Sequence, residues 1–411
     1  MNKGCSFWYK PPLRAAALLF AALLALSGWA AADTRLMVVS DLHYLEPSLY
    51  RGSDVFLQAL RRGDGKAAQY GEELMNALYQ TVLYEHPDAL IVTGDLTFNG
   101  EKLSHMALAG WFESIEEAGI PVWVIPGNHD INVASPVGYG NGMIYRAEGT
   151  SPEAFAAVYA DCLETGEAGF SYVAKVSDEL WVAMTDVAIY QDTAVTPGLF
   201  SSGHAAWLEG VLKNAREEGA RVVTATHHSL LVHTELYRDS FVMSGSEKMA
   251  SLCRTYGVKM NLSGHLHIQH IARDGELSDA VLGAFCMWPH RYALVTLQED
   301  GTLVYDAKAL DGRFLPEGLS DRSREWFAGI TADKAKAGIS GTGDEIEMMA
   351  EYAARFNLAY FSGTYSKDDP SWTEDPAYAL WKAQGNTSFI AYMGLVMNED
   401  TGDNLHLAIG E

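Results

Sequence analysis

Short apolar runs alternate along the chain with longer segments whose apolar positions recur at helical spacing. Runs rich in aliphatic and β-branched residues predict strands over 36–40, 89–93, 122–125, 180–184, 221–225 and 259–263. Between them, apolar residues three and four positions apart predict helices over 70–84, 101–117, 152–161, 204–218 and 246–256. Strands that alternate with helices in this way are typical of an α/β layered domain.

The pattern changes towards the C-terminus. Three more strands are expected within 280–308, and we interpret them as a meander that closes a second sheet. Beyond about residue 315 the spacing predicts helices over 323–336, 345–361, 376–384 and 388–397. We therefore expect an α/β domain over residues 33–315 and a small helical C-terminal domain over 316–411. An apolar stripe at Met349, Tyr352 and Phe356 is expected to form the core of that second domain.

The first 32 residues resemble a targeting segment. Lys3, Lys10 and Arg14 precede an apolar run over 15–26, and three alanines at 30–32 offer a cleavage site. The run is shorter than the stretch of about 20 residues that spans a bilayer. We expect a cleaved signal peptide over 1–32 and an exported protein, with an uncleaved membrane anchor as the alternative.

Charge narrows the range of partners. The formal net charge is −24, and loss of residues 1–32, which carry only cations, moves it to −27. Such a field repels nucleic acid polymers and anionic membrane surfaces, so membrane contact is expected only if the N-terminal segment stays attached. A small anionic substrate is still compatible with this charge where bound metal cations dominate the local field.

Cysteine usage does not suggest a zinc ribbon or a disulfide scaffold. Cys162, Cys253 and Cys286 are widely spaced beyond the N-terminal segment and form no C-x-x-C pair. We expect them to be small buried hydrophobic residues, with one disulfide and a leftover thiol as the alternative.

Candidate chemistry gathers in five blocks, each of which begins where a predicted strand ends. The blocks are Asp41-Leu42-His43, Gly94-Asp95, Gly127-Asn128-His129-Asp130, His227 and Gly264-His265-Leu266-His267. Loops at the carboxyl ends of strands open onto one rim of an α/β fold. Residues more than 220 positions apart in the sequence can therefore meet there.

The residue types in these blocks suit divalent cations. In an extended strand end, Asp41 and His43 would face the same way, and so would His265 and His267. Carboxylate with imidazole favours Mn, Fe or Zn over an oxygen-only calcium site. Asp95 has two oxygens with which to join two adjacent cations.

Further residues complete this set of candidates. Asn128 offers an amide oxygen, whereas its neighbour His129 is free for another task. One residue of the His227-His228 pair is expected to bind metal, and the other to pack or to bond locally. His105 lies shortly after the Gly94–Glu101 loop, so a metal role for it is left open. No metal role is expected for His86, His204, His233, His270, His290 or His406.

The ordered motifs D-x-H, G-D, G-N-H-[D/E], H and G-H-x-H resemble those of the calcineurin-like metallophosphoesterase superfamily. Within it, the arrangement is similar to class III cyclic nucleotide phosphodiesterases and exported bacterial phosphoesterases, including their G-D-L-T-x-x-G stretch at 94–100. Ser229 departs from the proline that many relatives carry two positions after the ligand histidine. The resemblance implies a four-layer α/β/β/α sandwich with a dinuclear metal centre.

The same resemblance implies an assignment of ligands and roles. One divalent cation would be bound by Asp41, His43, Asp95 and His267, and the other by Asp95, Asn128, His227 and His265. Two such cations, Mn, Fe or Zn, would supply hydroxide near neutral pH for attack on a phosphate ester. His129 would stabilise the phosphate charge or protonate the leaving group as the catalytic histidine.

Three functions are compatible with these features. Hydrolysis of a small phosphodiester, with cyclic nucleotides favoured, comes first. An exported phosphomonoesterase or nucleotidase would use the same ligands, so the ligand set cannot separate the two. A non-catalytic surface binding protein on this fold would be marked by lost ligands, and none is missing from the sequence.

Overall fold

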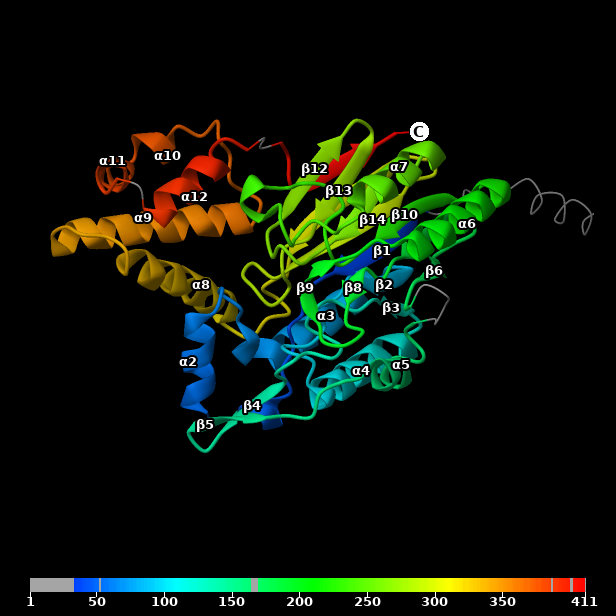
Figure 1. Ribbon diagram of the computed structural model, residues 1–411, viewed down its shortest axis with the longest axis horizontal. Coiled ribbons are helices and arrows are strands. Elements are labelled where there is room, and N and C mark those ends of the chain that lie inside the picture. Colours follow the sequence, from blue (N-terminus) through cyan, green and yellow to red (C-terminus); the bar gives the residue numbers. More distant parts are fainter. Residues whose placement is uncertain (1–32, 52, 164–168, 386, 400–401, 411) are drawn as a thin grey trace, which may run out of the picture.

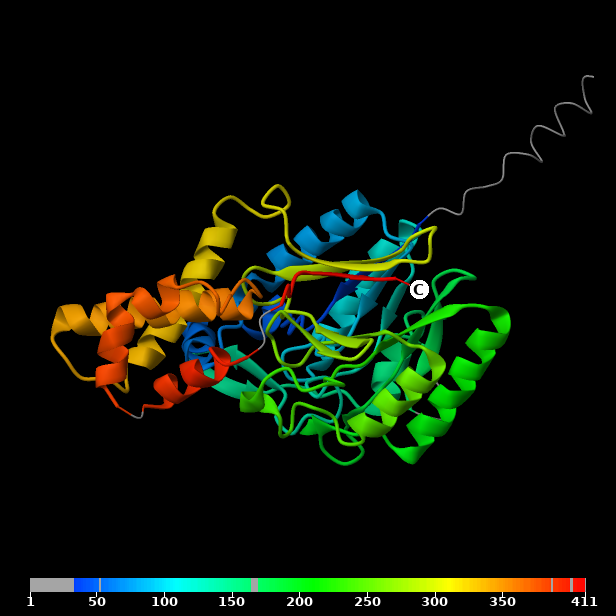
Figure 2. The same cartoon turned by 90° about the horizontal axis from the view of Figure 1, so that it is seen from above.

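The computed structural model describes residues 33–410 except 52, 164–168, 386 and 400–401. The predicted signal peptide over 1–32 therefore lies outside the described residues. Figures 1 and 2 show two central sheets covered by helices, with a group of further helices to one side. Among the described helices, none combines the length and the apolar character needed to cross a membrane.

The first sheet has six strands in the order β16-β15-β14-β1-β2-β3. Its parallel part consists of β1 (Thr34–Val39), β2 (Ala89–Val92) and β3 (Val122–Val124). Its antiparallel part consists of β14 (Arg291–Leu297), β15 (Leu303–Ala309) and β16 (His406–Ile409). The carboxyl ends of the parallel strands all lie at one edge, which brings the loops after them together.

The second sheet also has six strands, in the order β12-β13-β11-β10-β7-β6. They are β6 (Tyr172–Lys175), β7 (Leu180–Met184), β10 (Arg221–Ala225), β11 (Met260–Ser263), β12 (His270–Asp274) and β13 (Leu277–Val281). Strands β7, β10, β11 and β13 run parallel, and β6 and β12 flank them antiparallel.

Helices cover the outer face of each sheet. Apolar residues of α3 (Gly71–Glu85) and α4 (Lys102–Glu117) join the core cluster of the first sheet, and α5 (Pro152–Val158) packs beside them. On the second sheet the covering helices are α6 (Ser202–Glu218) and α7 (Ser246–Tyr256). This arrangement confirms the expected four-layer α/β/β/α sandwich, and Ser151 caps α5 through a bond to the amide of Ala154.

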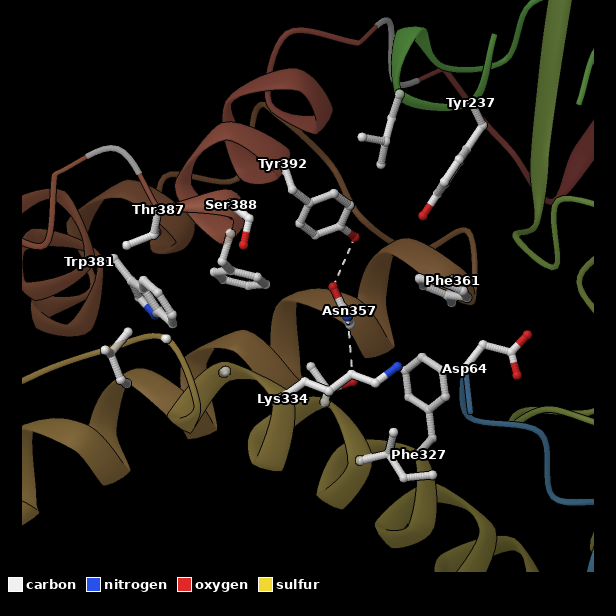
Figure 3. A pocket seen from close by; sticks show the side chains of 17 residues that line it. Asp64, Tyr237, Phe327, Lys334, Asn357, Phe361, Trp381, Thr387, Ser388 and Tyr392 are labelled. Atoms are coloured by element: carbon white, nitrogen blue, oxygen red, sulfur yellow. Dashed lines mark hydrogen bonds between the residues drawn. The ribbon is translucent and has the colours of Figure 1, made fainter. Parts of the chain in front are cut away.

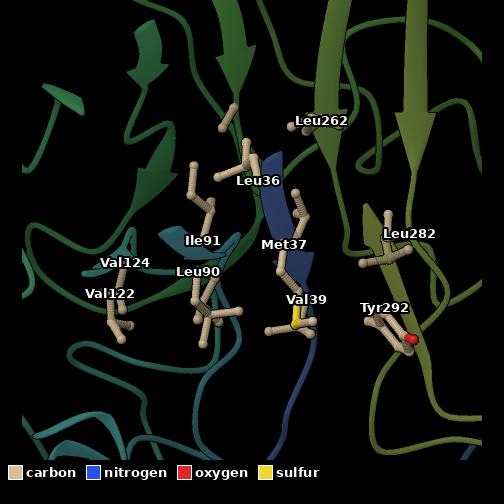
Figure 4. Close-up of a cluster of buried hydrophobic side chains, with 14 of the residues drawn as sticks. Leu36, Met37, Val39, Leu90, Ile91, Val122, Val124, Leu262, Leu282 and Tyr292 are labelled. Atoms are coloured by element: carbon tan, nitrogen blue, oxygen red, sulfur yellow. The ribbon is translucent and has the colours of Figure 1, made fainter. Parts of the chain in front are cut away.

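The main core lies between the sheets, where side chains of β1, β2 and β3 pack toward residues such as Leu262 and Leu282 (Figure 4). β7 shows why the strand runs are continuously apolar. Val182 points into this central cluster, whereas the next residue, Ala183, packs under α6 and α7. A strand covered on both faces needs apolar side chains at every position rather than at alternate ones.

The expected meander in the second sheet is wrong. β13 does belong to the second sheet, but the chain then crosses over, so that β14 and β15 lie in the first sheet next to β1. β13 and β14 are buried along most of their length and β15 at alternate positions, but the hydrophobic pattern does not identify the sheet that each strand joins. Strand pairing decides that question.

Several elements are absent from the predicted pattern. Most are short, with apolar runs too brief to show a period, whereas the nine-residue α2 is missed although its apolar residues have helical spacing. They are α2 (Asp54–Arg62), β4 (Val137–Gly140), β5 (Met143–Arg146), β8 (Ala188–Ile189), β9 (Val195–Gly198), α10 (Ser371–Glu374) and the 3-10 turns η1 (Pro47–Leu49), η2 (Ala68–Tyr70) and η3 (Glu235–Tyr237).

A helical C-terminal region follows β15. It contains α8 (Leu319–Lys336), α9 (Gly343–Phe361), α11 (Pro376–Ala383) and α12 (Ser388–Val396), and it lies beside the sandwich (Figure 1). The stripe of Met349, Tyr352 and Phe356 is fully buried, which confirms its core role. After α12 the chain returns to the sandwich, where β16 pairs with β15. That strand is not predicted by the sequence pattern.

The three cysteines within the described part of the chain are buried and free, as expected for small hydrophobic residues. Burial raises the pKa of the Cys253 thiol to about 12, which makes it unreactive at neutral pH.

Phe356 is the central aromatic of the helical region. Its ring centroid lies 5.2 Å from that of Tyr365 and 5.5 Å from that of Trp372. Phe356→Ala should lower the free energy of unfolding by about 3–5 kcal/mol, because it removes a buried ring and leaves a cavity. Urea unfolding followed by tryptophan fluorescence would measure this. Phe356→Leu should cost clearly less, and equal losses for both variants would contradict the role of cavity formation.

Candidate metal centre

The five polar blocks converge at the carboxyl ends of β1, β2, β3, β10 and β11. Seven predicted ligands lie there: Asp41, His43, Asp95, Asn128, His227, His265 and His267. Five of them are buried, whereas Asn128 and His267 keep partial exposure and mark the open side of the centre.

The first cluster contains Asp41, His43, Asp95 and His267, whose candidate ligand atoms all lie within 4.8 Å of one another. The two imidazole Nε2 atoms of His43 and His267 are 3.1 Å apart. The Oδ1 atom of Asp41 is 3.3 Å from Nε2 of His267, and the Oδ2 atom of Asp95 is 3.5 Å from Nε2 of His43.

The second cluster contains Asp95, His227 and His265 within the same limit of 4.8 Å. Nε2 of His227 lies 3.4 Å from Oδ1 of Asp95 and 3.3 Å from the amide oxygen of Asn128. The Asn128 amide is therefore placed to add an oxygen to this cluster.

Asp95 belongs to both clusters, and its two oxygens face different ones. Oδ2 faces His43 and Oδ1 faces His227. Burial alone would favour the neutral acid, but the positive charge of His227 and its hydrogen bond to the carboxylate outweigh burial and hold the pKa of Asp95 well below its usual range. A buried, ionised carboxylate whose two oxygens face different ligand clusters is the group expected to join two cations.

The side chains fit a pair of divalent cations. Burial lowers the pKa of His43 and His265 well below the usual value, so both rings are neutral and offer lone pairs. Nε2 of His265 is buried without a hydrogen-bond partner. Mixed imidazole nitrogens and carboxylate oxygens suit Mn, Fe or Zn. The chain is thus compatible with a dinuclear metal site, whose ligand assignment stays a prediction.

Left-handed backbone positions the ligands. The φ angles are 55° at Asp41, 41° at His43, 50° at Asp95, 68° at His265 and 60° at His267. Non-glycine residues rarely adopt such angles, and they cluster at functional sites. The extended strand end expected at Asp41 and His43 is therefore wrong, although the two side chains do meet in one cluster. His265 and His267, which were expected to face the same way, lie in different clusters. Each is turned inward by a left-handed turn beyond the strand.

Two glycines allow this close approach of the backbone. A Cβ at Gly94 would lie 2.7 Å from Nδ1 of His227. A Cβ at Gly264 would meet the side chains of Ser40 and Asp41. The glycines next to the ligands are therefore required because a side chain at either position would collide with the site.

Hydrogen bonds behind the ligands fix their orientation. Nδ1 of His227 donates to the carbonyl oxygen of Thr93 at 2.8 Å, which leaves Nε2 free toward the cluster. Nδ1 of His267 lies 3.3 Å from a carboxylate oxygen of Asp64. Partners of this kind orient metal-binding histidines and make them more basic.

Asp64 and Lys66 were missed by the sequence analysis because they lie in a turn-rich segment between β1 and α3 that carries no motif. Nζ of Lys66 is 3.1 Å from the Asp64 oxygen that also faces His267. Although burial lowers the pKa of Lys66, the Asp64 carboxylate outweighs it and raises that pKa, so the side chain stays charged. A cation thus lies close to the metal centre.

Asp130 was placed in a motif without a role, and the structure supplies one. Its carboxylate accepts hydrogen bonds from the amides of Gly127, Leu96 and Thr97 at 2.8, 3.2 and 3.0 Å. It therefore ties the loop after β2 to the loop after β3. Burial, followed by the charge of Asp95, raises the pKa of Asp130 to about 7.

His129 belongs to neither cluster but lies beside the first, with its ring centroid 4.9 Å from that of His43. Its Nδ1 is 3.0 Å from the carbonyl oxygen of Phe98 and 2.9 Å from the side-chain oxygen of Asn99. Both partners are acceptors, so Nδ1 carries the proton. Burial lowers the pKa of the ring.

The remaining histidines lie outside both clusters. His228 donates from Nε2 to the carbonyl oxygen of Thr196 at 2.7 Å, and burial lowers its pKa to about 3. His105, which the sequence left open, is bonded to Tyr159 and to the Asp130 carbonyl beneath the loops. It therefore supports the loop rather than binding a cation.

His227→Ala should deplete one of the two metals, because it removes the imidazole that faces Asp95 and Asn128. His228→Ala is the matched control and should leave both metals bound, because His228 belongs to neither cluster and its Nε2 donates to the carbonyl oxygen of Thr196. Elemental analysis after gel filtration measures the bound metal. Loss of metal from His228→Ala but not from His227→Ala would show that His228 is the metal ligand.

Comparison with known proteins agrees with this arrangement. The family described as calcineurin-like phosphoesterase matches residues 34–269. No curated protein is matched by sequence.

Solved structures also resemble the chain. A dimetal phosphatase from Danio rerio shares 14% identity, with coverage of 68% of this chain and 96% of that one and a TM-score of 0.49. A putative 5'-nucleotidase from Staphylococcus aureus shares 14% identity over 72% of this chain and 58% of that one, with a TM-score of 0.42. The family match covers more than half of the chain and includes all seven predicted ligands, and this protein belongs to the calcineurin-like phosphoesterases.

Proposed function

We propose that this protein is a metal-dependent phosphodiesterase that hydrolyses a small phosphodiester, with cyclic nucleotides as the favoured class. The observation that carries the proposal is the division of the two Asp95 oxygens between two ligand clusters. Two adjacent cations can hold both the attacking and the leaving oxygen of an in-line displacement at phosphorus. The preference for a diester is supported by the resemblance of the 94–100 segment to class III phosphodiesterases.

Two divalent cations bound at the centre would act as Lewis acids on the phosphoryl oxygens and would lower the pKa of a water molecule between them. The chain itself orients those cations. Asp95 would set their separation, and the left-handed turns at Asp41 and His265 would aim the outer ligands inward. Buried side chains that already hold these positions need little reorganisation during the reaction.

His129 is proposed as the catalytic residue that serves the leaving group. Its backbone amide donates to Oδ1 of Asp95 at 2.8 Å, which fixes the residue against the carboxylate that lies in both clusters. Phe98 and Asn99 hold the Nδ1 proton, so Nε2 is the nitrogen left to contact the substrate. In its protonated form the ring would donate a proton from Nε2 to the leaving oxygen.

A substrate panel with added Mn²⁺ tests the function. Bis-p-nitrophenyl phosphate should be hydrolysed with a kcat/KM at least about 10-fold above that for p-nitrophenyl phosphate, and Asp95→Asn should lower the rate at least about 100-fold. A preference for the monoester would support the phosphomonoesterase alternative instead. Absence of both activities with two metals bound would favour a non-catalytic binding protein.

His129→Ala should leave the metal content near that of the parent while the rate falls by about 10²–10⁴-fold, because proton transfer is lost but no ligand is removed. The loss should be smaller for a p-nitrophenyl ester than for a phenyl ester, since p-nitrophenolate leaves without a proton. Loss of half the metal would show that His129 is a ligand, and an equal rate loss for both esters would contradict its role as an acid.

A further inference from the structure

A cavity of about 660 Å³ lies between the helical C-terminal region and the sandwich. Its walls come from α8, α9, α11, α12 and η3, together with Asp64 from the segment before α3. Figure 3 shows Asp64 and Tyr237 at one end of this cavity and Trp381 and Thr387 at the other. The volume is typical of sites that bind small organic molecules.

The cavity shares two walls with the metal centre. At one, the Asp64 carboxylate lines the cavity and also contacts His267 at 3.3 Å. At the other, the ring centroid of Tyr237 lies 4.9 Å from that of Phe241, which in turn lies 4.8 Å from that of His265. His267 therefore lies one side chain away from the cavity, and His265 lies two contacting aromatic rings away.

The lining is mainly aromatic and apolar. Six rings contribute to it, from Tyr237, Phe327, Phe361, Trp381, Phe389 and Tyr392. Asn357 is already bonded, because its side-chain oxygen accepts from the Tyr392 hydroxyl at 2.8 Å and its nitrogen donates to Thr331 at 3.4 Å. An apolar ligand could fill this space without breaking those bonds.

Charged groups of the lining are engaged elsewhere. Lys334 donates to the carbonyl oxygen of Gly63 at 2.6 Å, and Asp64 is paired with Lys66 at 3.1 Å. The Asp64 carboxylate would repel a phosphoryl group, and Lys334, the one cation among the lining residues, already directs a donor to a backbone carbonyl. The phosphoryl group of a substrate therefore belongs at the metal centre, and the cavity suits an uncharged organic group attached to it.

We infer that this cavity binds the apolar organic group of the phosphate ester whose phosphoryl group is held at the metal centre. The inference rests on the proposed function and narrows it to esters with a bulky ring or chain. Aromatic walls favour flat rings through stacking, and the same walls accept an alkyl chain by apolar burial. The helical region then acts as the specificity element of the enzyme.

A series of diesters with one common leaving group tests the inference. The members are p-nitrophenyl phosphates whose second ester group is methyl, n-octyl or 2-naphthyl, so the chemical step is held constant. We expect kcat/KM for the octyl or the naphthyl ester to exceed that of the methyl ester by at least about 10-fold, mainly through KM. A larger gain for naphthyl identifies a ring as the preferred group, and a larger gain for octyl identifies a chain. Equal values for all three esters would overturn the inference.

A filling variant links the preference to this cavity. Gly338 lines it, and a Cβ there would meet no heavy atom within 4 Å. Gly338→Trp should remove the advantage of the large esters and leave the methyl ester unchanged. Gly343→Trp is the matched control, because Gly343 begins α9 in open space and does not line the cavity. Equal behaviour of the two variants would overturn the assignment.

Binding can be measured apart from turnover. Methyl 2-naphthyl phosphate is titrated by calorimetry into metal-loaded parent, Gly338→Trp and Gly343→Trp proteins, and 2-naphthol is titrated into the same proteins treated with EDTA. Both ligands should bind the parent and Gly343→Trp with similar affinity. Their affinity for Gly338→Trp should be at least about 10-fold lower. Binding without any hydrolysis would contradict the proposed function but keep the cavity. Hydrolysis of the methyl ester without this binding pattern would support the proposed function and contradict the role of the cavity.

Discussion

The position of Asp95 is the constraint on which the rest of the site depends. Its buried carboxylate faces His43 with one oxygen and His227 with the other, and it accepts the amide of His129. Ionised carboxylates are costly to bury without a compensating charge. Protonated histidines can supply that charge in the metal-free protein, and a pair of divalent cations supplies it more strongly. The surrounding loops are built to keep this single side chain between two groups of ligands.

A second layer of contacts connects the site to the helical region. The turn that carries Asp64 and Lys66 is held by α8, since Trp326 donates to the carbonyl oxygen of Lys66 at 3.0 Å and Lys334 donates to that of Gly63. Asp64 in turn contacts His267. The C-terminal helices therefore help to position a predicted ligand as well as forming the cavity, and the sandwich and the helices form one functional unit.

Prediction from sequence succeeded where the physical signal is local. Runs such as 180–184 and 221–225 match strands β7 and β10 residue for residue, because continuous burial on both faces leaves an unbroken apolar run. The helix over 246–256 matches α7 for the same local reason. Prediction failed for brief elements such as β8, because two residues are too few to show a hydrophobic period.

The sequence by itself determined an α/β domain through its local periodicity. Its motifs determined the residues that meet at the strand ends, and their resemblance to a known family implied the α/β/β/α layering. Tertiary structure alone decided that β14, β15 and β16 extend the first sheet, because pairing between strands far apart in the sequence leaves no local pattern. It also decided the placement of Asp64, which is exposed by about half and carries no motif. Its contact with His267 spans about 200 positions of sequence and exists only because the fold brings the two loops together.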